Sequence, residues 1–121
     1  MLSDRIAAVM IHAPEPQAAL EWYLRAFPMA ARVTVGEPKF ELLRIGELQL
    51  EFVPSDEKVA AGPAGTVVYW SVPNFNAALK SLQAIGAGLY RGPMTIEDGQ
   101  AMCQVRDPWG NCLGIRGTLG P

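Results

Sequence analysis

The sequence lacks the residues from which many catalytic sites are built. It contains a single histidine, His12, and two cysteines, Cys103 and Cys112. Two cysteines do not make a disulfide framework, so in a reducing compartment we expect both to be free thiols. The sequence has no nucleophile elbow for a Ser-His-Asp triad, and no Cys-His arrangement is evident.

Concentrated charge and long apolar runs are missing as well. Ten basic and twelve acidic residues give a net charge of −2, and no cluster of Lys or Arg stands out. Nucleic-acid binding requires a concentrated basic footprint, so we expect no nucleic-acid partner. The apolar run at residues 6–11 is too short to span a bilayer and lacks the small-residue pattern of a signal-peptide cleavage site. We therefore expect a cytoplasmic protein with no membrane partner.

What the chain does contain is an internal repeat. At an offset of 59 residues (73 minus 14), Pro14 aligns with Pro73, and the Ala-Ala-Leu of residues 18–20 aligns with that of residues 77–79. Each copy reads as an apolar β-branched run, then a proline, then a helical pattern. The repeat therefore predicts two modules of the same construction.

The two helical segments carry boundary signals. Pro16 suits an early helical position and Pro28 ends the first helix, while Asn74 is a candidate N-cap and Gly86 a candidate C-terminal stop for the second. Between these boundaries, apolar residues recur at helical spacing: Leu20, Tyr23, Leu24 and Phe27 in the first helix, and Phe75, Ala78, Leu79, Leu82 and Ile85 in the second.

Three strand signals follow each helix. They span residues 31–35, 39–46 and 48–54 after the first, and residues 88–93, 100–106 and 111–117 after the second. Asp98-Gly99 predicts a hairpin turn, and the longer turn raises the repeat offset to about 63 (113 minus 50).

We therefore predict one α+β domain over residues 1–121. It consists of two tandem βαβββ modules, at about residues 1–56 and 65–121, joined by a polar, Gly- and Pro-rich linker at residues 57–64. One helix covers only one face of a four-stranded sheet. We therefore expect the uncovered faces of two curled mixed sheets to surround a cleft.

A polar turn, Arg106-Asp107-Pro108-Trp109-Gly110-Asn111, precedes the last strand signal. Pro108 sets φ at the first corner of a turn, Gly110 can take positive φ, and Asp107 can bond back to the backbone. This turn, the first-helix segment Ala-Ala-Leu-Glu-Trp-Tyr-Leu-Arg-Ala-Phe and the tandem modules together resemble the vicinal oxygen chelate superfamily. That superfamily includes glyoxalases, bleomycin-resistance proteins and extradiol dioxygenases, and the resemblance covers nearly the whole chain.

The resemblance implies a cleft in which the metal enzymes of the superfamily hold an ion with four ligands. One ligand comes from the first strand and one from the last strand of each module. These positions fall on Ala8, Val67, Glu51 and Gly114. Three of these four residues have no side-chain atom that can bind a metal ion, whereas a catalytic divalent site uses about three protein ligands. We therefore expect neither a metal ion nor another cofactor.

Alternation along the strands indicates which residues share the cleft face with those positions. The opposite residues are strongly apolar, as a helix-covered face requires. The predicted ligand-binding residues are Met10, His12, Gln49, Glu51, Tyr69, Cys112 and Arg116.

Each of these residues has more than one possible role. Glu51 is the candidate catalytic acid or base, or else a solvated carboxylate or a partner of Arg116. His12 is a base, a shifted metal ligand or a hydrogen-bonded residue at a strand end. Tyr69 contacts a ligand or packs in the core. Arg116 clamps an anion or lies at a strand edge, and Cys112 is a reactive thiol or a small buried residue.

Two functions remain open at this level. The first is a metal-free protein of the glyoxalase/bleomycin-resistance type that binds a small molecule in the cleft, as a homodimer. The alternative is a lyase, isomerase or dioxygenase of the same superfamily that uses Glu51, with or without a metal ion. A purely structural domain would instead fill its cleft with side chains, so whether the protein is an enzyme is left open.

Overall fold

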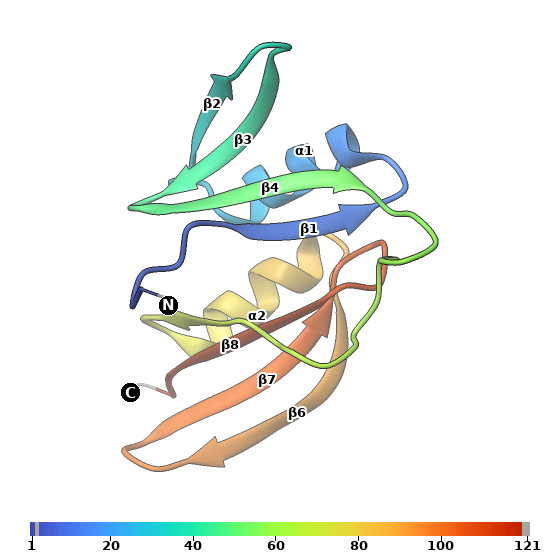
Figure 1. The fold of residues 1–121 in the computed structure, drawn as a ribbon. Coiled ribbons are helices and arrows are strands. Elements are labelled where there is room, and N and C mark those ends of the chain that lie inside the picture. Colours follow the sequence, from blue (N-terminus) through green and yellow to red (C-terminus); the bar gives the residue numbers. More distant parts are fainter. Residues whose placement is uncertain (2, 120–121) are drawn as a thin grey trace. The chain divides into compact units, whose positions relative to one another are not determined.

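The computed structural model describes residues 1 and 3–119. The chain divides into two compact units, Met1–Ala60 and Ala61–Pro121. In chain order the first unit holds β1 (Val9–Ala13), α1 (Pro16–Ala26), β2 (Ala31–Val35), β3 (Phe40–Ile45) and β4 (Leu48–Pro54). The second holds β5 (Tyr69–Val72), α2 (Phe75–Ala84), β6 (Gly88–Ile96), β7 (Gln100–Arg106) and β8 (Cys112–Thr118) (Figure 1). The predicted α+β fold of two βαβββ modules is confirmed.

The first unit is a four-stranded mixed sheet with the strand order β1-β4-β3-β2. β1 and β4 are parallel, and the other pairs are antiparallel. α1 begins with Pro16 at its first turn and packs on β4, and its residues Trp22 and Tyr23 are buried. The ring of Tyr23 lies 5.3 Å from the ring of Phe52 on β4, centroid to centroid. Leu50, fully buried beside it on the same strand, marks the helix-covered side of the sheet.

The second unit repeats this arrangement in the order β5-β8-β7-β6, with β5 parallel to β8. The Asn74 side chain caps α2 by accepting a hydrogen bond from the backbone N–H of Ala77 at 3.0 Å. Gly86 follows the helix with φ +103°, a left-handed conformation that glycine adopts without strain. Both helix boundaries agree with the sequence prediction. Phe75, at the start of α2, is fully buried.

The hairpin between β6 and β7 turns at Asp98 and Gly99, whose φ angles of 62° and 66° fit the two-residue turn predicted for this pair. β6 continues to Ile96, three residues beyond its predicted end at Pro93. Proline lacks a backbone N–H, but β6 is an edge strand, and its pairing with β7 shifts register between Arg91 and Met94. The edge position explains why the strand tolerates the proline that the sequence pattern treated as its end.

The two sheets repeat the same register. Met10 pairs with Glu51 in the first sheet, and Tyr69 pairs with Gly114 in the second. Met10 and Tyr69 are 59 residues apart (69 minus 10), and Glu51 and Gly114 are 63 apart (114 minus 51), so the pairs are equivalent under the two repeat offsets. β1 begins one residue after Ala8 and β5 two residues after Val67, so these two positions lie just before their strands.

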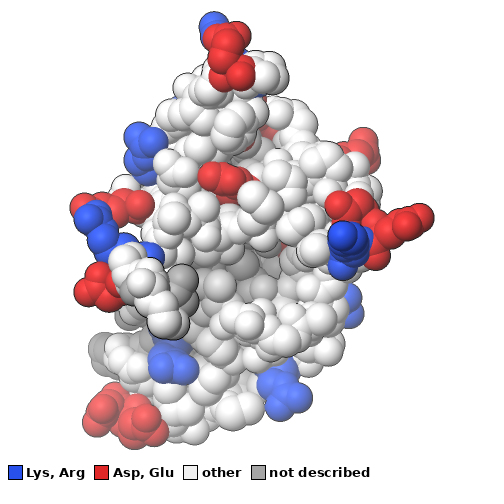
Figure 2. Space-filling view, in the orientation of Figure 1, with Lys and Arg blue, Asp and Glu red and all other residues white. Residues whose placement is uncertain are grey.

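Among the described residues, neither helix is long and apolar enough to cross a membrane; α1 has 11 residues and α2 has 10. Basic and acidic side chains are interspersed on the face drawn in Figure 2.

Candidate functional site

The polar turn between β7 and β8 is held together by the carboxylate of Asp107, which is 4 % exposed. Its Oδ1 accepts hydrogen bonds from the backbone N–H groups of Trp109 and Asn111, each at 2.9 Å. Its Oδ2 accepts one from the Asn111 side-chain amide at 3.1 Å. Gly110 has φ +94°, and the Asn111 Oδ1 accepts the backbone N–H of Gly62 at 3.0 Å. The turn therefore has the predicted geometry, and its residues stabilise the backbone.

In the first sheet, the predicted site residues lie on the face opposite α1. Met10 pairs with Glu51 and His12 with Val53, so these side chains share one face. The Gln49 amide donates a hydrogen bond to the Glu51 carboxylate (Nε2···Oε2 3.2 Å), while Met10 is 52 % exposed. Gln49 thus orients a half-buried carboxylate, which can accept further hydrogen bonds or a proton.

His12 lies near the loop that follows β4. Its charge contributes to lowering the pKa of Asp56, although the main causes are the backbone N–H groups of Val59 and Lys58, which donate to the Asp56 carboxylate at 2.8 and 2.9 Å. Hydrogen bonds to the ionised form favour ionisation. His12 is half-buried at the end of β1, which leaves its role as a base or as a structural residue open.

In the second sheet, the predicted residues belong to one hydrogen-bonded row. The Cys112 thiol donates to Gln104 (Sγ···Oε1 3.3 Å), and the Gln104 amide donates to the Tyr69 hydroxyl (Nε2···Oη 2.9 Å). The guanidinium carbon of Arg116 lies over the Tyr69 ring, 5.2 Å from its centroid. Burial raises the pKa of the Cys112 thiol, partly offset by the charge of Arg106. Cys112 is therefore protonated at neutral pH and acts as a donor.

The ring of Tyr69 lies directly against Gly114. A Cβ atom built at Gly114 would be 2.5 Å from Cδ1 of Tyr69 and 2.7 Å from Cε1, far closer than carbon atoms approach one another. The tyrosine therefore occupies the space that any side chain at position 114 would need. With the ring in contact with Gly114 and Arg116, its hydroxyl is the part left to meet a ligand.

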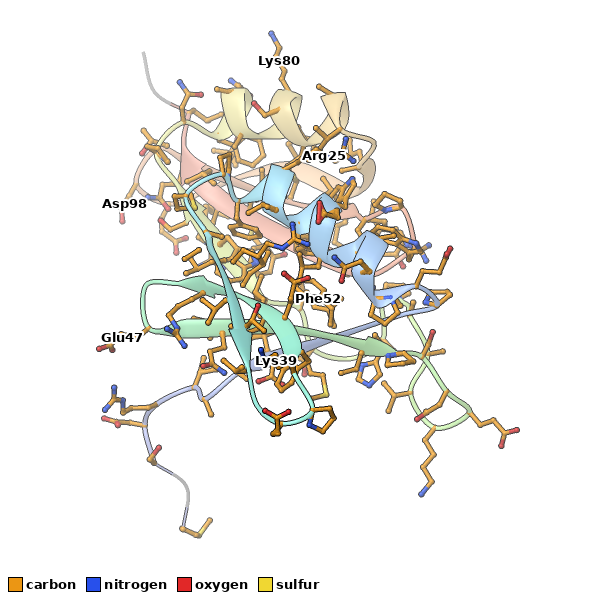
Figure 3. The ribbon with its side chains drawn as sticks, turned by 90° about the horizontal axis from the view of Figure 1, so that it is seen from above. Arg25, Lys39, Glu47, Phe52, Lys80 and Asp98 are labelled. Carbon is orange, nitrogen blue, oxygen red and sulfur yellow. The ribbon has the colours of Figure 1, made fainter. Side chains whose placement is uncertain are left out.

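A groove of about 430 Å³ lies on the other face of the first sheet, between α1 and the strands β3 and β4. Leu20, Phe40 and Phe52 supply apolar walls, and Lys39 stands at the β2–β3 turn (Figure 3). The carboxylate of Glu41 also lines the groove.

Glu41 is held by Arg32, which donates to it at 2.7 Å from Nε and at 3.1 Å from Nη2. This hydrogen bonding holds the pKa of Glu41 below its usual value. None of the predicted ligand-binding residues lines the groove.

The sequence profile of the Glyoxalase/Bleomycin resistance protein/Dioxygenase superfamily matches residues 5–115. The chain belongs to this superfamily. A comparison with curated proteins gave no match.

Several solved structures share the fold. TnmS3, an antibiotic-binding protein from Streptomyces sp. CB03234, superimposes with a TM-score of 0.73 at 15 % identity, covering 98 % of both chains. A glyoxalase-related enzyme from Fulvimarina pelagi gives 0.74 at 17 % identity over 96 % of this chain and 89 % of that one. A glyoxalase/bleomycin resistance protein/dioxygenase family enzyme from Burkholderia phytofirmans PsJN gives 0.72 at 16 % identity over 93 % and 98 %. Such identities establish the fold and leave the chemistry to the site itself.

The residues at the superfamily's metal positions do not fit a metal ion. Among residues 1 and 3–119, no group of three or more His, Cys, Asp or Glu side chains that could hold an ion is found. Gly114 has no donor atom, and the Tyr69 ring excludes a side chain there. Glu51 is the one position of the four with a metal-binding side chain, and one carboxylate falls short of the usual three ligands.

Sequence reasoning did not include Gln104, which joins Tyr69 to Cys112. The signal was present in the alternation of β7, where Ala101, Cys103 and Val105 are buried and the residues between them face the other way. Gln104 pairs with Gly114 across the sheet, which places it on the predicted face. The expectation that the faces of the two sheets line one cleft stays a prediction.

Proposed function

We propose that this superfamily member binds a small organic molecule, without a metal ion, on the polar sheet faces that carry the predicted residues. The observation that supports it most directly is the position of Tyr69. Its ring lies in the space of a residue-114 side chain, and its hydroxyl is bonded to Gln104. An aromatic ring with a hydrogen-bonded hydroxyl thus lies beside Gly114, where the resemblance places a metal ligand.

A structural neighbour is consistent with this proposal. TnmS3 is an antibiotic-binding protein with the same fold over nearly its whole length. Its fold is evidence that a chain of this construction can hold a small molecule. The row Tyr69–Gln104–Cys112 supplies the few oriented polar groups that such sites use beside apolar walls.

Thermal unfolding and metal analysis test the proposal together. We expect purified protein to contain far less than one divalent ion per chain. A screen of small aromatic and amphipathic compounds should yield ligands that raise the unfolding midpoint, because a ligand that binds only the folded state stabilises it by about 2.7 kcal/mol at 100 times its Kd. Stoichiometric metal that disappears in Glu51→Gln but persists in Glu47→Gln, at the exposed β3–β4 turn (Figure 3), would overturn it.

One observation favours a second candidate, an enzyme in which Glu51 moves a proton. The carboxylate is half-buried and oriented by Gln49 at 3.2 Å, as a general base must be. If this candidate is correct, a compound found in the screen is turned over, and Glu51→Gln abolishes turnover while binding is retained. Binding without turnover supports the first proposal.

A further inference from the structure

The strands of the second sheet are basic. They contain Arg91, Arg106 and Arg116 and no Asp or Glu. The three acidic residues of this unit lie in turns, at Glu97, Asp98 and Asp107. The first unit, by contrast, has nine acidic and six basic residues. Positive charge is therefore placed on the sheet that carries the Tyr69 row.

Of these arginines, Arg116 is the one whose guanidinium contacts the Tyr69 ring. Arg106 donates to the backbone carbonyl of Gly110 at 2.9 Å and lies over the ring of Tyr90 at 5.3 Å, so it holds the turn and the edge strand. Arg116 is exposed, its guanidinium lies over the Tyr69 ring, and it makes no ion pair with the residues that the structure describes. A guanidinium presents a planar fork of donors that fits a carboxylate with two parallel hydrogen bonds.

The Tyr69 hydroxyl adds a donor beside it. The Tyr69 oxygen already accepts a hydrogen bond from the nitrogen of the Gln104 amide. The Cys112 thiol donates to the oxygen of the same amide and so holds it in place. A phenolic hydroxyl that accepts in this way keeps its own hydrogen for another acceptor. The two groups that converge here are therefore both donors, and they match an anionic or strongly accepting group.

Next to this pair of donors the sheet is apolar. Met102 pairs with Arg116 across β7 and β8, and Met94 pairs with Met102 across β6 and β7, so both methionines lie on the same face. Met94 is 43 % exposed. Methionine side chains adapt to irregular or aromatic surfaces.

We infer that the ligand of this face is a small carboxylate with an apolar body. Its carboxylate is bound by Arg116 and the Tyr69 hydroxyl, and its body lies over Met102 and Met94. The inference rests on the proposed function, because it names the class of molecule that the proposed site takes.

The probe pair 2-naphthoate and 2-naphthamide tests the inference, since the two differ chiefly in charge. Isothermal titration calorimetry gives their Kd values for the wild-type protein and for Arg116→Gln, Tyr69→Phe and Lys80→Gln. Lys80 lies on α2 and points away from it (Figure 3), so its variant removes the same charge away from the site. Circular dichroism and the unfolding midpoint of each variant separate loss of binding from loss of folding.

We expect 2-naphthoate to bind at least tenfold more tightly than 2-naphthamide. Arg116→Gln should weaken the carboxylate about tenfold or more, as loss of a charge-assisted pair does, while the amide changes by less than about twofold. Tyr69→Phe, which keeps the ring on Gly114, should weaken it roughly three- to tenfold. Lys80→Gln should leave both values unchanged, and added salt should weaken the carboxylate alone.

Three results would overturn the inference. Equal binding of the two probes, failure of the carboxylate to bind, or equal loss in Lys80→Gln and Arg116→Gln each show that no specific carboxylate site exists at Arg116. If the amide or another neutral compound binds in the first two cases, the proposed small-molecule function survives without this ligand class. Failure of every compound in the wider screen contradicts the proposed function itself.

Discussion

Gly114 shows how one missing side chain determines the position of its neighbour. The Tyr69 ring rests where a Cβ at position 114 would be 2.5 Å away. Glycine is required here because the Tyr69 ring approaches the backbone so closely. The backbone angles of Gly114 are not left-handed, so they do not themselves require glycine. The same contact sets the height of the Tyr69 hydroxyl above the sheet and so its bond to Gln104.

We predict that Gly114→Ala lowers the free energy of unfolding by about 1–3 kcal/mol, the usual cost of overpacking. Gly88→Ala is the matched control, because a Cβ there meets no atom within 4 Å. Urea unfolding measures both. The double variant Gly114→Ala/Tyr69→Ala should lose less than the sum of the single variants; additive losses would show that the ring does not cause the strain.

The two thiols should differ in their accessibility. Cys103 is 1 % exposed and Cys112 is half-buried, and burial raises the pKa of both thiols. With a disulfide reagent at pH 8, we expect Cys112→Ala, which retains Cys103, to react only as fast as it unfolds. Cys103→Ala, which retains Cys112, should react faster, and both should react at once in urea.

The raised thiol pKa values also predict the direction in which stability changes at alkaline pH. A folded state that holds its thiol protons is stabilised below the ordinary thiol pKa of about 8.5, and this contribution is lost as the pH rises through the higher folded values. Stability measured from pH 8 to 10.5 should therefore fall less in Cys103→Ala than in the wild type. An identical fall in both would contradict the assignment.

At the scale of elements, each helix depends on its first turn. Asn74 accepts the N–H of Ala77, whereas α1 begins after Glu15 with no side-chain cap and relies on Pro16. We predict that Asn74→Ala costs about 1 kcal/mol of stability, as loss of an N-cap does. Asn76→Ala, on the exposed surface of the same helix turn, should be neutral or slightly stabilising. Equal losses in thermal unfolding would rule out the cap.

The β2–β3 hairpin is tied to α1 by charge. Arg32 contacts Glu21 on the helix at 2.6 Å and Glu41 on β3 at 2.7 Å. Because the folded pKa of Glu41 is lowered mainly by this arginine, its contribution to stability is present above the unfolded value of about 4.3 and is lost as the pH falls through the folded value.

We therefore predict that the wild-type protein loses more stability between pH 5 and pH 3 than Glu41→Gln does. Glu47→Gln is the control, since the Glu47 side chain is 90 % exposed and its pair with Arg5 is long, at 3.5 Å. Thermal unfolding at the two pH values measures the difference. If Glu41→Gln loses as much stability between pH 5 and pH 3 as the wild type, the pair between Arg32 and Glu41 is not coupled to protonation.

At the scale of the molecule, the boundary between Ala60 and Ala61 falls in a segment without helix or strand, residues 55–68. Lys58 is exposed in this segment, and the Gly62 N–H beyond it is bonded to Asn111. We predict that trypsin first cuts after Lys58. Lys58→Gln should remove that cut and Lys80→Gln should not, as intact-mass measurements of short digests will show. A first cut after a Lys or Arg within a helix or strand would mean that this element opens more readily than the segment.

Much of the fold could be predicted from the sequence, because the patterns that carry it are local. Alternation and turn residues gave β2, β4 and β7 at their observed bounds, and Asn74 and Gly86 marked the ends of α2. The continuation of β6 through Pro93 could not be predicted, because a strand tolerates proline there only as an edge strand. Edge position is a property of the assembled sheet.

The site was predictable to the level of faces and no further. Alternation placed Glu51 with Met10 and Arg116 with Tyr69. The packing of the Tyr69 ring on Gly114 depends on a side-chain rotamer chosen by the folded neighbours, so neither the contact nor the role of Gln104 followed from spacing. The homodimer, too, stays a prediction, which light scattering will test.

The contact between Tyr69 and Gly114 limits which substitutions position 114 can accept. A mutation that placed a carboxylate at position 114 would bring the new side chain against the aromatic ring of Tyr69. The ring would first have to be exchanged for something smaller, and that change alone removes the partner of Gln104. A carboxylate at position 114 therefore requires two substitutions, and the one at position 69 removes the hydroxyl that Gln104 holds.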